Sequence, residues 1–419
     1  MRFQAPRGTR DVLPQEAHRW VHLEKTFRDI CHLYGYSEIR TPTFEDTELF
    51  VRGVGEGTDI VSKEMYTFKD RAGRSLTLKP EGTAPVIRAY LEHSLGTPNQ
   101  ITRLFYITPI FRYERPQKGR LRESHQTGVE LIGSGTPDAD AEVIELTVRF
   151  YQTLGIRNIS IKLNSLGEEE CRKSYREALL EYARPHLRDF PEEFRARCEK
   201  NPLRLLDSKD PEVQKIVADA PPITRYYEKE TIEHFESLQK LLNSLGITYE
   251  IDPKLVRGLD YYTKTVFEVQ SEFLGAQNAL CGGGRYDNLI EEYGGQPTPA
   301  VGVAMGIERA LMVMETLEIE KKVERLLDVF AVCLTENRIE FAKFVKFLRD
   351  SGISVVTDLE FRSAKSQFRQ ADKSGANYAV ILGDEELEKG VVKVKDMRSG
   401  EEVTLPSGEV LRVLRHHPA

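Results

Sequence analysis

The sequence lacks long apolar runs and closely spaced cysteine pairs. No apolar run approaches the roughly 20 residues that cross a bilayer, and the N-terminus lacks the apolar centre of a signal peptide. We therefore expect no membrane segment and a cytoplasmic location. The cysteines form an odd set without a CxxC pair, which argues against a disulfide framework or a zinc site and predicts reduced thiols. They are Cys31, Cys171, Cys198, Cys281 and Cys333.

The chain also lacks an excess of positive charge. Its 59 basic and 66 acidic side chains give a net charge of −7, so affinity for a polyanion is not built into the chain as a whole. Any nucleic-acid contact must be local. The segment 112–122 has a local net charge of +4, which fits either such a contact or a solvated hairpin loop. Its basic residues are Arg112, Arg115, Lys118, Arg120 and Arg122, against Glu114 alone.

The familiar nucleotide-binding loops are missing as well. Residues 258–265 come close to a P-loop, but Thr263 stands where a second glycine must let the backbone wrap around phosphate. Residues 53–57 miss the GxGxxG spacing by one position and follow no convincing strand. A nucleotide site of either familiar form is therefore not expected.

What is present is an ordinary globular composition that can form more than one domain. The 419 residues are 40% hydrophobic and 30% charged, which suggests two to four domains. The charged segment 316–325 predicts a boundary near residue 326, which gives domains at 1–326 and 327–419. Long helical patterns interrupted by prolines predict a helical insertion at about 168–250. Beyond residue 326, strand and helix patterns alternate as βαβαβ, which predicts a small parallel or mixed sheet covered by helices.

Local patterns near the N-terminus predict a helix, two extended segments and a second helix. Residues 18–33 have the spacing of one buried helical face, which is formed by Trp20, Leu23, Phe27 and Ile30. Residues 35–42 read as an extended segment ended by a proline, and residues 75–79 alternate like a strand. We expect Thr83 to cap a helix that ends at Gly96.

The most informative stretch is a predicted antiparallel hairpin between residues 104 and 132. Two alternating segments, LFYITPIFRYE and HQTGVELI, flank the basic loop. A period of two puts Gln126, Gly128 and Glu130 on one face, with Val129 and Leu131 behind them. The pattern predicts a polar floor on which Gly128 leaves space for a ligand close to the backbone. An amphipathic hairpin with a solvated face fits the same pattern.

Three further segments carry polar groups at predicted turns. Glu81 and Thr83 lie at a strand-to-helix junction, where a plain capping turn is the alternative to a ligand contact. Residues 255–262 bring together an arginine, an aspartate and two tyrosines, although a structural turn with Arg257 paired to Asp260 also explains them. Residues 281–287 supply three glycines before a helix that Asp287 could cap.

A fourth segment, 300–309, reads as a strand of small residues entering a helix. Arg309 would lie in the first helical turn, away from the buried stripe. A cation at that position opposes the helix dipole, so we expect it to meet an anion. An exposed arginine without a ligand remains the alternative.

Together these motifs resemble class II aminoacyl-tRNA synthetases and, within them, the histidyl-tRNA synthetase family, over nearly the whole chain. Residues 111–114 with the following loop resemble motif 2, residues 302–309 motif 3, and residues 35–42 motif 1. The segments LVRGLDYY and GGGRYD resemble the two histidine-specific signatures. The resemblance implies an α+β fold: an antiparallel catalytic sheet of six or seven strands with flanking helices and a helical insertion, followed by a C-terminal α/β anticodon-binding domain.

The resemblance also implies an activity and partners. A histidine–tRNA ligase activates L-histidine with ATP to histidyl-adenylate and transfers it to the 3′-terminal ribose of tRNA(His). The family implies a homodimer through motif 1, and Mg²⁺ that accompanies the phosphates of ATP without metal ligands of its own in the protein. Recognition of histidine by buried polar partners would make editing unnecessary.

By the same resemblance, catalysis falls to Arg112 and Arg257, which would hold the α-phosphate. Binding of ATP is assigned to Arg112, Glu114, Arg120, Arg257 and Arg309. Binding of histidine is assigned to Glu81, Thr83, Gln126, Glu130, Tyr261, Tyr262 and Tyr286.

One residue departs from the family pattern. Ser124 stands where motif 2 usually carries an aromatic residue that stacks on adenine, and loss of that platform corresponds to about 1–3 kcal/mol of stacking. This departure favours an alternative reading, a histidine-sensing regulatory subunit of ATP phosphoribosyltransferase that does not charge tRNA. The arginines and the C-terminal domain argue for the ligase. A nucleic-acid-binding protein without catalysis is a third reading.

Overall fold

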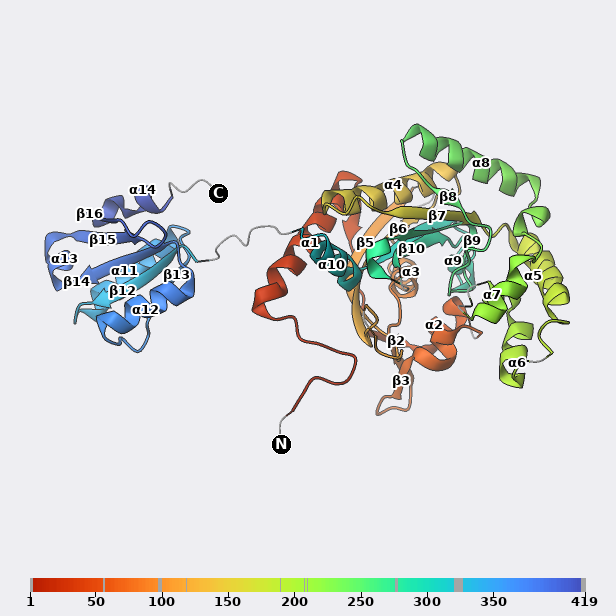
Figure 1. The fold of residues 1–419 in the computed structure, drawn as a ribbon, viewed down its shortest axis with the longest axis horizontal. Coiled ribbons are helices and arrows are strands. Elements are labelled where there is room, and N and C mark those ends of the chain that lie inside the picture. Colours follow the sequence, from red (N-terminus) through yellow and green to blue (C-terminus); the bar gives the residue numbers. More distant parts are fainter. Residues whose placement is uncertain are drawn as a thin grey trace. The chain divides into compact units, whose positions relative to one another are not determined.

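The computed structural model forms two compact units, Met1–Glu320 and Lys321–Ala419 (Figure 1). The boundary predicted at residue 326, and Lys118 of the basic loop, lie outside the described residues. The structure describes residues 3–55, 57–96, 100–117, 119–188, 190–206, 208, 210–275, 278–319 and 327–415.

The first unit is built on a large mixed sheet. Within the described residues it has eight strands, of which the central six run antiparallel and the two short edge strands, β1 and β8, pair in parallel with their neighbours. The predicted antiparallel sheet is thus confirmed in its centre, while the parallel edges were not predicted. The order is β1 (Ser37–Glu38), β5 (Thr102–Phe111), β6 (Glu123–Ile132), β11 (Ala300–Gly306), β10 (Ala279–Arg285), β9 (Thr263–Gln270), β7 (Ser160–Ser165) and β8 (Glu250–Ile251).

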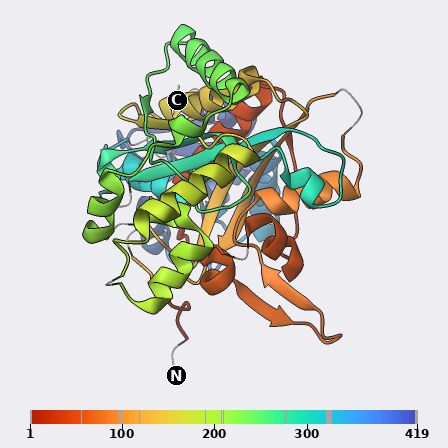
Figure 2. The ribbon, with the colours of Figure 1, turned by 90° about the vertical axis from the view of Figure 1, so that its right-hand side faces the viewer.

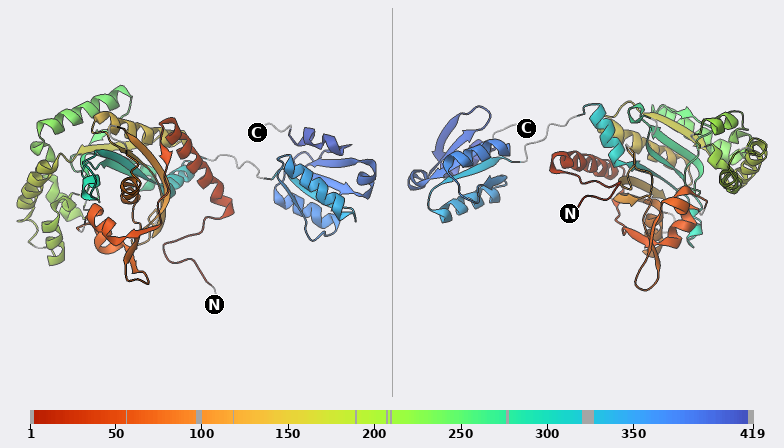
Figure 3. Two further views of the ribbon diagram at one scale, coloured as in Figure 1. Left: turned by 180° about the vertical axis from the view of Figure 1, so that it is seen from behind. Right: turned by 60° about the horizontal axis from the view of Figure 1, so that its bottom comes forward.

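Helices cover one face of this sheet (Figure 3). They are α1 (Pro14–Leu33), α4 (Pro137–Thr153), α8 (Lys229–Ser244) and α10 (Ile307–Thr316). Because strand side chains alternate, every second residue packs against these helices, including Phe105, Val129 and Phe267, each with no exposed surface. Burial of one such side chain contributes about 1.5–3 kcal/mol. The helix predicted at residues 18–33 is confirmed, and its predicted face is the buried one.

The other face of the sheet carries the polar floor predicted from the β5–β6 hairpin, which is confirmed as antiparallel. Around it lies a second apolar cluster that includes α3 (Thr83–Glu92) and residues 171–227 of the helical segment after β7. The helices predicted in that segment are present, and Figure 2 shows them in yellow-green to green. They are α5 (Glu169–Ala183), α6 (Glu192–Lys200), α7 (Pro211–Ala218) and α8, with single turns at η2 (Pro202–Leu205) and η3 (Ile223–Tyr226).

A small antiparallel sheet projects from the same unit, as Figure 2 shows in orange. Its strands are β2 (Phe44–Asp46), β4 (Ser75–Leu78) and β3 (Tyr66–Lys69), and α2 (Thr47–Val54) and η1 (Ile60–Glu64) lie beside it in the chain. Two short elements flank β10, η4 (Glu272–Leu274) and α9 (Leu289–Glu292). Asp287 was expected to cap the latter, but the cap residue is Asn288, and Asp287 accepts hydrogen bonds from Arg285 and from the Ala300 amide.

The second unit confirms the predicted βαβαβ alternation. In the described residues its sheet order is β13 (Val355–Thr357), β12 (Val329–Leu334), β14 (Tyr378–Gly383), β15 (Val391–Asp396) and β16 (Glu402–Pro406). The first three strands are parallel, and the last two add antiparallel pairs that the sequence did not indicate. Its helices are α11 (Arg338–Asp350), α12 (Ala364–Ser374), α13 (Asp384–Lys389) and α14 (Val410–Leu414), with a turn at η5 (Ser407–Glu409).

Three features of the described residues concern membrane insertion, metal binding and cysteine chemistry. No helix among them has both the length and the apolar character needed to cross a membrane. No cluster of histidine, cysteine and acidic side chains in that part of the chain is arranged to hold a metal ion. All five cysteines are buried thiols, and burial raises the pKa of Cys171 to about 12.

Candidate active site

A cavity of about 240 Å³ opens over the polar floor of the large sheet. Most of the residues predicted to bind substrates line it: Glu81, Thr83, Arg112, Glu114, Arg120, Gln126, Arg257, Tyr261, Tyr262 and Arg309. Glu130 and Tyr286 do not line it. Both are almost completely buried, and Glu130 is bonded to the cavity residue Thr83. The fold therefore gathers side chains from distant parts of the sequence around one space.

Glu130 on β6 is a buried carboxyl group directly behind the cavity wall. The Thr83 hydroxyl donates to Glu130 Oε1 at 2.8 Å, and the Tyr286 hydroxyl donates to Oε2. Burial raises the pKa of Glu130 to about 8, although the hydrogen bonds from Tyr286 and Thr83 act in the opposite direction. At neutral pH the group is therefore mostly protonated until a donor or a cation arrives to favour its charged form.

Glu81 provides a second buried carboxyl group, and it caps helix α3. Its two oxygens accept the backbone N–H groups of Thr83 and Ala84, each at 2.7 Å. The prediction that Thr83 caps this helix is therefore wrong, because the Thr83 hydroxyl bonds to Glu130 instead. The helix also ends at Glu92, before the predicted stop at Gly96. Burial raises the pKa of Glu81, against the opposing effect of the two backbone hydrogen bonds.

Three tyrosine side chains form an aromatic wall beside these carboxyl groups. The rings of Tyr261 and Tyr262 lie 4.8 Å apart, and those of Tyr261 and Tyr286 lie 5.6 Å apart in an edge-to-face arrangement. Burial raises the pKa of all three hydroxyl groups, to about 12 for Tyr262. They therefore stay protonated and can donate hydrogen bonds at neutral pH.

The floor position that was expected to receive a ligand is filled by protein. A side chain added at Gly128 would collide with the Tyr106 ring, and one added at Gly82 would meet the same ring. The prediction that Gly128 leaves space for a ligand is therefore wrong. Its missing side chain accommodates Tyr106, which lies opposite it on β5.

Four arginines line the cavity: Arg112, Arg120, Arg257 and Arg309. Arg112, at the end of β5, donates from Nε to the Pro80 carbonyl at 2.7 Å. Arg309, in the first turn of α10, donates to the Ala279 carbonyl at 2.6 Å, so it faces the site as expected. Burial, and then the nearby Arg120, lower the pKa of Arg309. Positive charges are thus crowded at this end of the cavity, which favours binding of an anion.

Arg257 is held by a partner that the sequence did not indicate. Its guanidinium pairs with Glu268 on β9 at 2.5 Å, whereas Asp260 accepts a hydrogen bond from Asn201 at 3.0 Å. The alternative of a structural turn with Arg257 paired to Asp260 is therefore wrong. Burial favours the neutral form of Arg257, but Tyr262 and Glu268 outweigh it and raise the pKa. A side chain at Gly282 would collide with this guanidinium, which explains one glycine of the GGG run.

The basic loop after β5 meets the site along residues 119–121, which line the cavity, and the Gly119 carbonyl accepts a hydrogen bond from Arg309 Nε at 3.3 Å. Arg120 pairs with Glu114 at 2.6 Å, and both line the cavity. Arg122 instead stacks on the Tyr113 ring, 3.9 Å from its centroid. The loop therefore contributes Arg120 to the cavity, while Arg122 packs on the loop's own aromatic residue.

Ser124 lies on the cavity wall, opposite Ile110 on the neighbouring strand. The adjacent His125 is fixed by Glu308, whose carboxylate contacts the ring Nδ1 at 2.9 Å and the backbone N–H at 3.0 Å. The His125 ring also packs edge-on against Trp20. At this point the cavity wall therefore consists of the small hydroxyl group of Ser124 and the aliphatic side chain of Ile110.

Comparisons with known proteins agree with this arrangement. Residues 8–310 match the family described as histidyl-tRNA synthetase, and residues 328–417 match a family described as anticodon binding domain. The chain is 48% identical over 417 residues to a histidine–tRNA ligase of Caldanaerobacter subterraneus, covering 99% of this chain and 100% of that protein. The chain belongs to the histidyl-tRNA synthetase family.

Other relatives and solved structures extend this family assignment. A Bacillus subtilis histidine–tRNA ligase is 47% identical, with 99% of each chain covered. The apo histidyl-tRNA synthetase of S. aureus has a TM-score of 0.84 and 37% identity, covering 99% of this chain and 100% of that one. A Bacillus halodurans structure titled as an ATP phosphoribosyltransferase regulatory subunit/histidyl-tRNA synthetase has a TM-score of 0.65 and 26% identity, covering 91% and 98%. Histidyl-tRNA synthetases, as class II enzymes, use ATP as a substrate.

Sequence reasoning missed three residues that shape this histidyl-tRNA synthetase site. Glu268 holds Arg257. Its only signal in the sequence is that it is the single acidic residue of the otherwise apolar segment TVFEV. Tyr106, which fills the floor, lies on the period-two face of β5 that leads to Arg112, the residue directly after the strand. Glu308 fixes His125. The two residues are 183 positions apart in the sequence, so only the folded structure reveals their contact.

Proposed function

We propose that this chain activates L-histidine with ATP and transfers the histidyl group to the 3′-terminal ribose of tRNA(His). The observation that carries the proposal is the meeting of Arg112, Arg257 and Arg309 in one cavity, beside the buried carboxyl groups of Glu81 and Glu130. Cationic groups suit a triphosphate and a carboxylate, while the buried carboxyl groups suit an amino group and an imidazole.

Histidine would occupy the end of the cavity lined by the carboxyl groups and tyrosines. Glu81, Thr83 and Gln126 offer oxygen atoms to the α-amino group, whose positive charge requires acceptors. Glu130 and Tyr262 suit the imidazole, which in its neutral form has one donor and one acceptor nitrogen. Tyr261 and Tyr286 close the aromatic wall around it. Buried polar groups left unpaired would penalise an apolar amino acid.

ATP would occupy the end lined by the arginines. In the first step a carboxylate oxygen of histidine attacks the α-phosphorus, a new oxygen–phosphorus bond forms, and pyrophosphate leaves. Arg112 and Arg257 bind the α-phosphate from two sides and neutralise the two anions that must meet, and Arg120 and Arg309 bind the γ end. The guanidinium of Arg112 is already held by the Pro80 carbonyl, and that of Arg257 by Glu268. Both would stabilise the charge of the transition state in a reaction that needs no protein nucleophile.

The cavity also fits the Mg²⁺ that accompanies ATP. Glu114 and Glu308 both line it, and Mg²⁺ typically binds one or two carboxylates together with substrate phosphates. The ion would neutralise charge on the β and γ phosphates. Glu114 is already paired with Arg120, so this arginine and the ion would act on the same end of the triphosphate.

The second step transfers the histidyl group to tRNA, and the remaining parts of the chain fit that role. Residues 1–326 would form the catalytic domain with its insertion at about 168–250, and residues 327–419 would bind the anticodon, in line with the family match at 328–417. We also propose a homodimer and, because tRNA is charged where proteins are made, a cytoplasmic location.

A histidine-sensing regulatory subunit is the second candidate. Ser124 at the adenine end and the likeness to the Bacillus halodurans structure favour it. The convergence of the arginines and the presence of the C-terminal unit favour the ligase. A direct assay decides between them: the purified chain is mixed with tRNA, ATP and labelled histidine. The ligase forms labelled tRNA, whereas binding of histidine without any labelled tRNA would support the sensor.

A further inference from the structure

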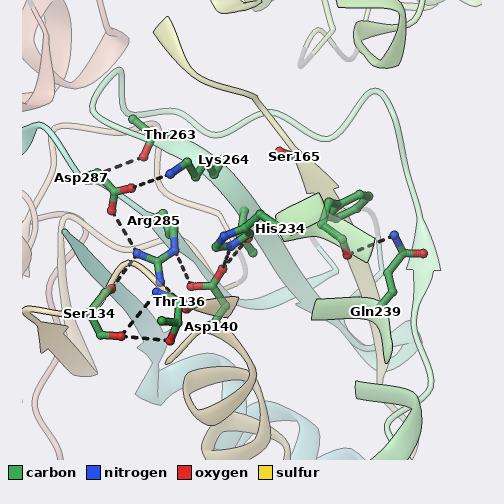
Figure 4. A network of polar contacts seen from close by, with 12 residues as sticks. Ser134, Thr136, Asp140, Ser165, His234, Gln239, Thr263, Lys264, Arg285 and Asp287 are labelled. Atoms are coloured by element: carbon green, nitrogen blue, oxygen red, sulfur yellow. Dashed lines mark hydrogen bonds and ion pairs between the residues drawn. The ribbon is translucent and has the colours of Figure 1, made fainter. Parts of the chain in front are cut away.

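A network of buried charges surrounds Arg285, the residue before Tyr286 (Figure 4). Its centre is the ion pair between Arg285 and Asp140, two side chains with no exposed surface, in which Nε and Oδ1 lie 2.7 Å apart. The same guanidinium donates to the carbonyl oxygens of Ser134 at 2.9 Å and Thr136 at 2.7 Å. Arg285 is thereby fixed to helix α4 and to the loop that enters it.

The network is joined to the pocket through the next residue in the chain. Tyr286 follows Arg285 directly, its backbone N–H donates to the Ala300 carbonyl at 2.9 Å, and its hydroxyl donates to Glu130. The pairing of β10 with β11 is regular through Arg285 and Val301, whereas its register against β9 shifts between Gly284 and Arg285, so sheet pairing holds this segment firmly on one side only. The anchoring of the Arg285 side chain supports the other side and so helps to place the Tyr286 hydroxyl against Glu130.

Asp140 also ties the network to the helical segment after β7. Its Oδ2 accepts the Thr265 hydroxyl of β9 at 2.6 Å and lies 2.7 Å from Nε2 of His234 on helix α8. Because the carboxylate paired with Arg285 can only accept, Nε2 of His234 carries the hydrogen. One carboxylate thus links α4, β9, β10 and α8 (Figure 4).

Stability alone is a poor reason for such an arrangement. A buried ion pair loses so much hydration that well-packed apolar side chains often serve the fold equally well. What a guanidinium adds is a planar set of donors with fixed directions. This geometry suits the task of holding a neighbouring group in place.

We propose that Arg285 is a positioning residue for the histidine pocket, and that helix α8 helps to hold Arg285 in place through the hydrogen bond between His234 and Asp140. The inference rests on the proposed function. It predicts a selective effect, because the arginines at the ATP end are anchored separately, Arg257 by Glu268 and Arg309 by the Ala279 carbonyl. Loosening the network displaces Tyr286 and Glu130 while the triphosphate site is retained.

The first test is Arg285→Lys, measured by histidine-dependent exchange of pyrophosphate into ATP. Lysine keeps the charge but not the planar set of donors, so kcat/KM for histidine should fall about 10- to 100-fold through misplacement of the pocket, with KM for ATP within about twofold. The wild-type chain is assayed in parallel, and its failure to exchange with histidine would refute the proposed function itself. An active wild type with an unchanged kcat/KM for histidine in the variant would refute the positioning role.

The second test uses a change that leaves the ion pair intact. His234→Phe keeps a ring but loses the hydrogen bond to Asp140, so KM for histidine should rise about three- to tenfold, the equivalent of one hydrogen bond. His234→Gln places an amide donor near the position of Nε2 and should restore the wild-type value. Glu233→Gln, on the same helix in an exposed pair with Lys229, is the control.

Two outcomes would overturn the proposal in this second test. One is an equal KM for histidine in the His234→Phe and wild-type chains. The other is a joint rise of KM for histidine and for ATP, which a general loosening of the fold predicts. Because His234 is at the edge of the network, with 10% of its side chain exposed, this pair of variants decides the matter even if Arg285→Lys fails to fold.

Discussion

At the scale of single residues, Arg257, which we propose to bind the α-phosphate, is held in place by another side chain. It is fixed by Glu268 and lines the cavity at the same time, so its orientation does not depend on substrate. Such preorganised charge is commonly the largest contribution to stabilising a transition state. The same holds for Arg112 and Arg309, which backbone carbonyls orient.

The first prediction concerns Arg257→Ala. Loss of one preorganised donor should lower the rate of pyrophosphate exchange about 100- to 1000-fold. Exchange kinetics measure the loss, and circular dichroism checks that the fold is retained. The control is Arg74→Ala, an exposed arginine paired with Asp70 in a turn. Near-normal exchange by Arg257→Ala would remove this residue from the mechanism.

The second prediction concerns the proton on Glu130. Its folded pKa of about 8 lies above the usual value for glutamate, so the proton is bound below that pH and is released as the pH rises through it. A charged carboxylate accepts the imidazole N–H more strongly than a neutral carboxyl group does, so histidine should bind more tightly as the pH rises from about 6 to 8. The pKa of Glu130 rises from 4.5 to about 8 on folding, so its contribution to the free energy of unfolding is fully present below pH 4.5. This contribution is lost as the pH rises through about 8.

Calorimetry in two buffers of different ionisation enthalpy measures that proton. At pH 7 the wild-type chain should release about one more proton on binding histidine than Glu130→Gln does. Equal proton release by the two chains would show that Glu130 does not ionise on binding.

The third prediction concerns Ser124→Phe. An aromatic ring at this position, next to Ile110 on the cavity wall, should add about 1–3 kcal/mol of stacking on the base and lower KM for ATP, with KM for histidine unchanged. Ser124→Ala serves as the control for loss of the hydroxyl group. A KM for ATP that rises in Ser124→Phe would mean that the base does not lie against this wall.

At the scale of helices and strands, one glycine of β10 allows an arginine to lie against the strand. Gly282 lies directly under the Arg257 guanidinium, so Gly282→Ala should displace that group and reduce kcat for exchange more than it reduces stability, which overpacking lowers by about 1–3 kcal/mol. Gly258→Ala, where an added methyl group meets open space, is the control. Equal activity of both variants would contradict the account of this strand.

The success of sequence reasoning also varied with the element. Helix α1 and the β5–β6 hairpin were predictable because each has one apolar face with a strict period, and such faces must be buried. The cap of α3 was not, since Thr83 is the better capping residue by type, whereas the Thr83 hydroxyl bonds to Glu130 and the amides are left to Glu81. The positions of Tyr106 and Glu268 depend on contacts across the sheet, which no local pattern specifies.

At the scale of the whole molecule, the two units of the chain carry separable parts of the proposed reaction. Residues 1–326 contain the cavity and should retain histidine-dependent exchange when expressed alone, whereas charging of tRNA should fall sharply without the C-terminal unit. Parallel exchange and charging assays of the full chain and of this fragment measure both effects. A fragment that charges tRNA as well as the full chain does would contradict the role proposed for residues 327–419.

The central claim is that one cavity binds histidine and ATP together so that the carboxylate meets the α-phosphorus. Pyrophosphate exchange into ATP, measured with each of the twenty amino acids in turn and without tRNA, tests it most directly. The account predicts rapid exchange with L-histidine and background rates with the others. Exchange driven by another amino acid, or none with histidine, would contradict it.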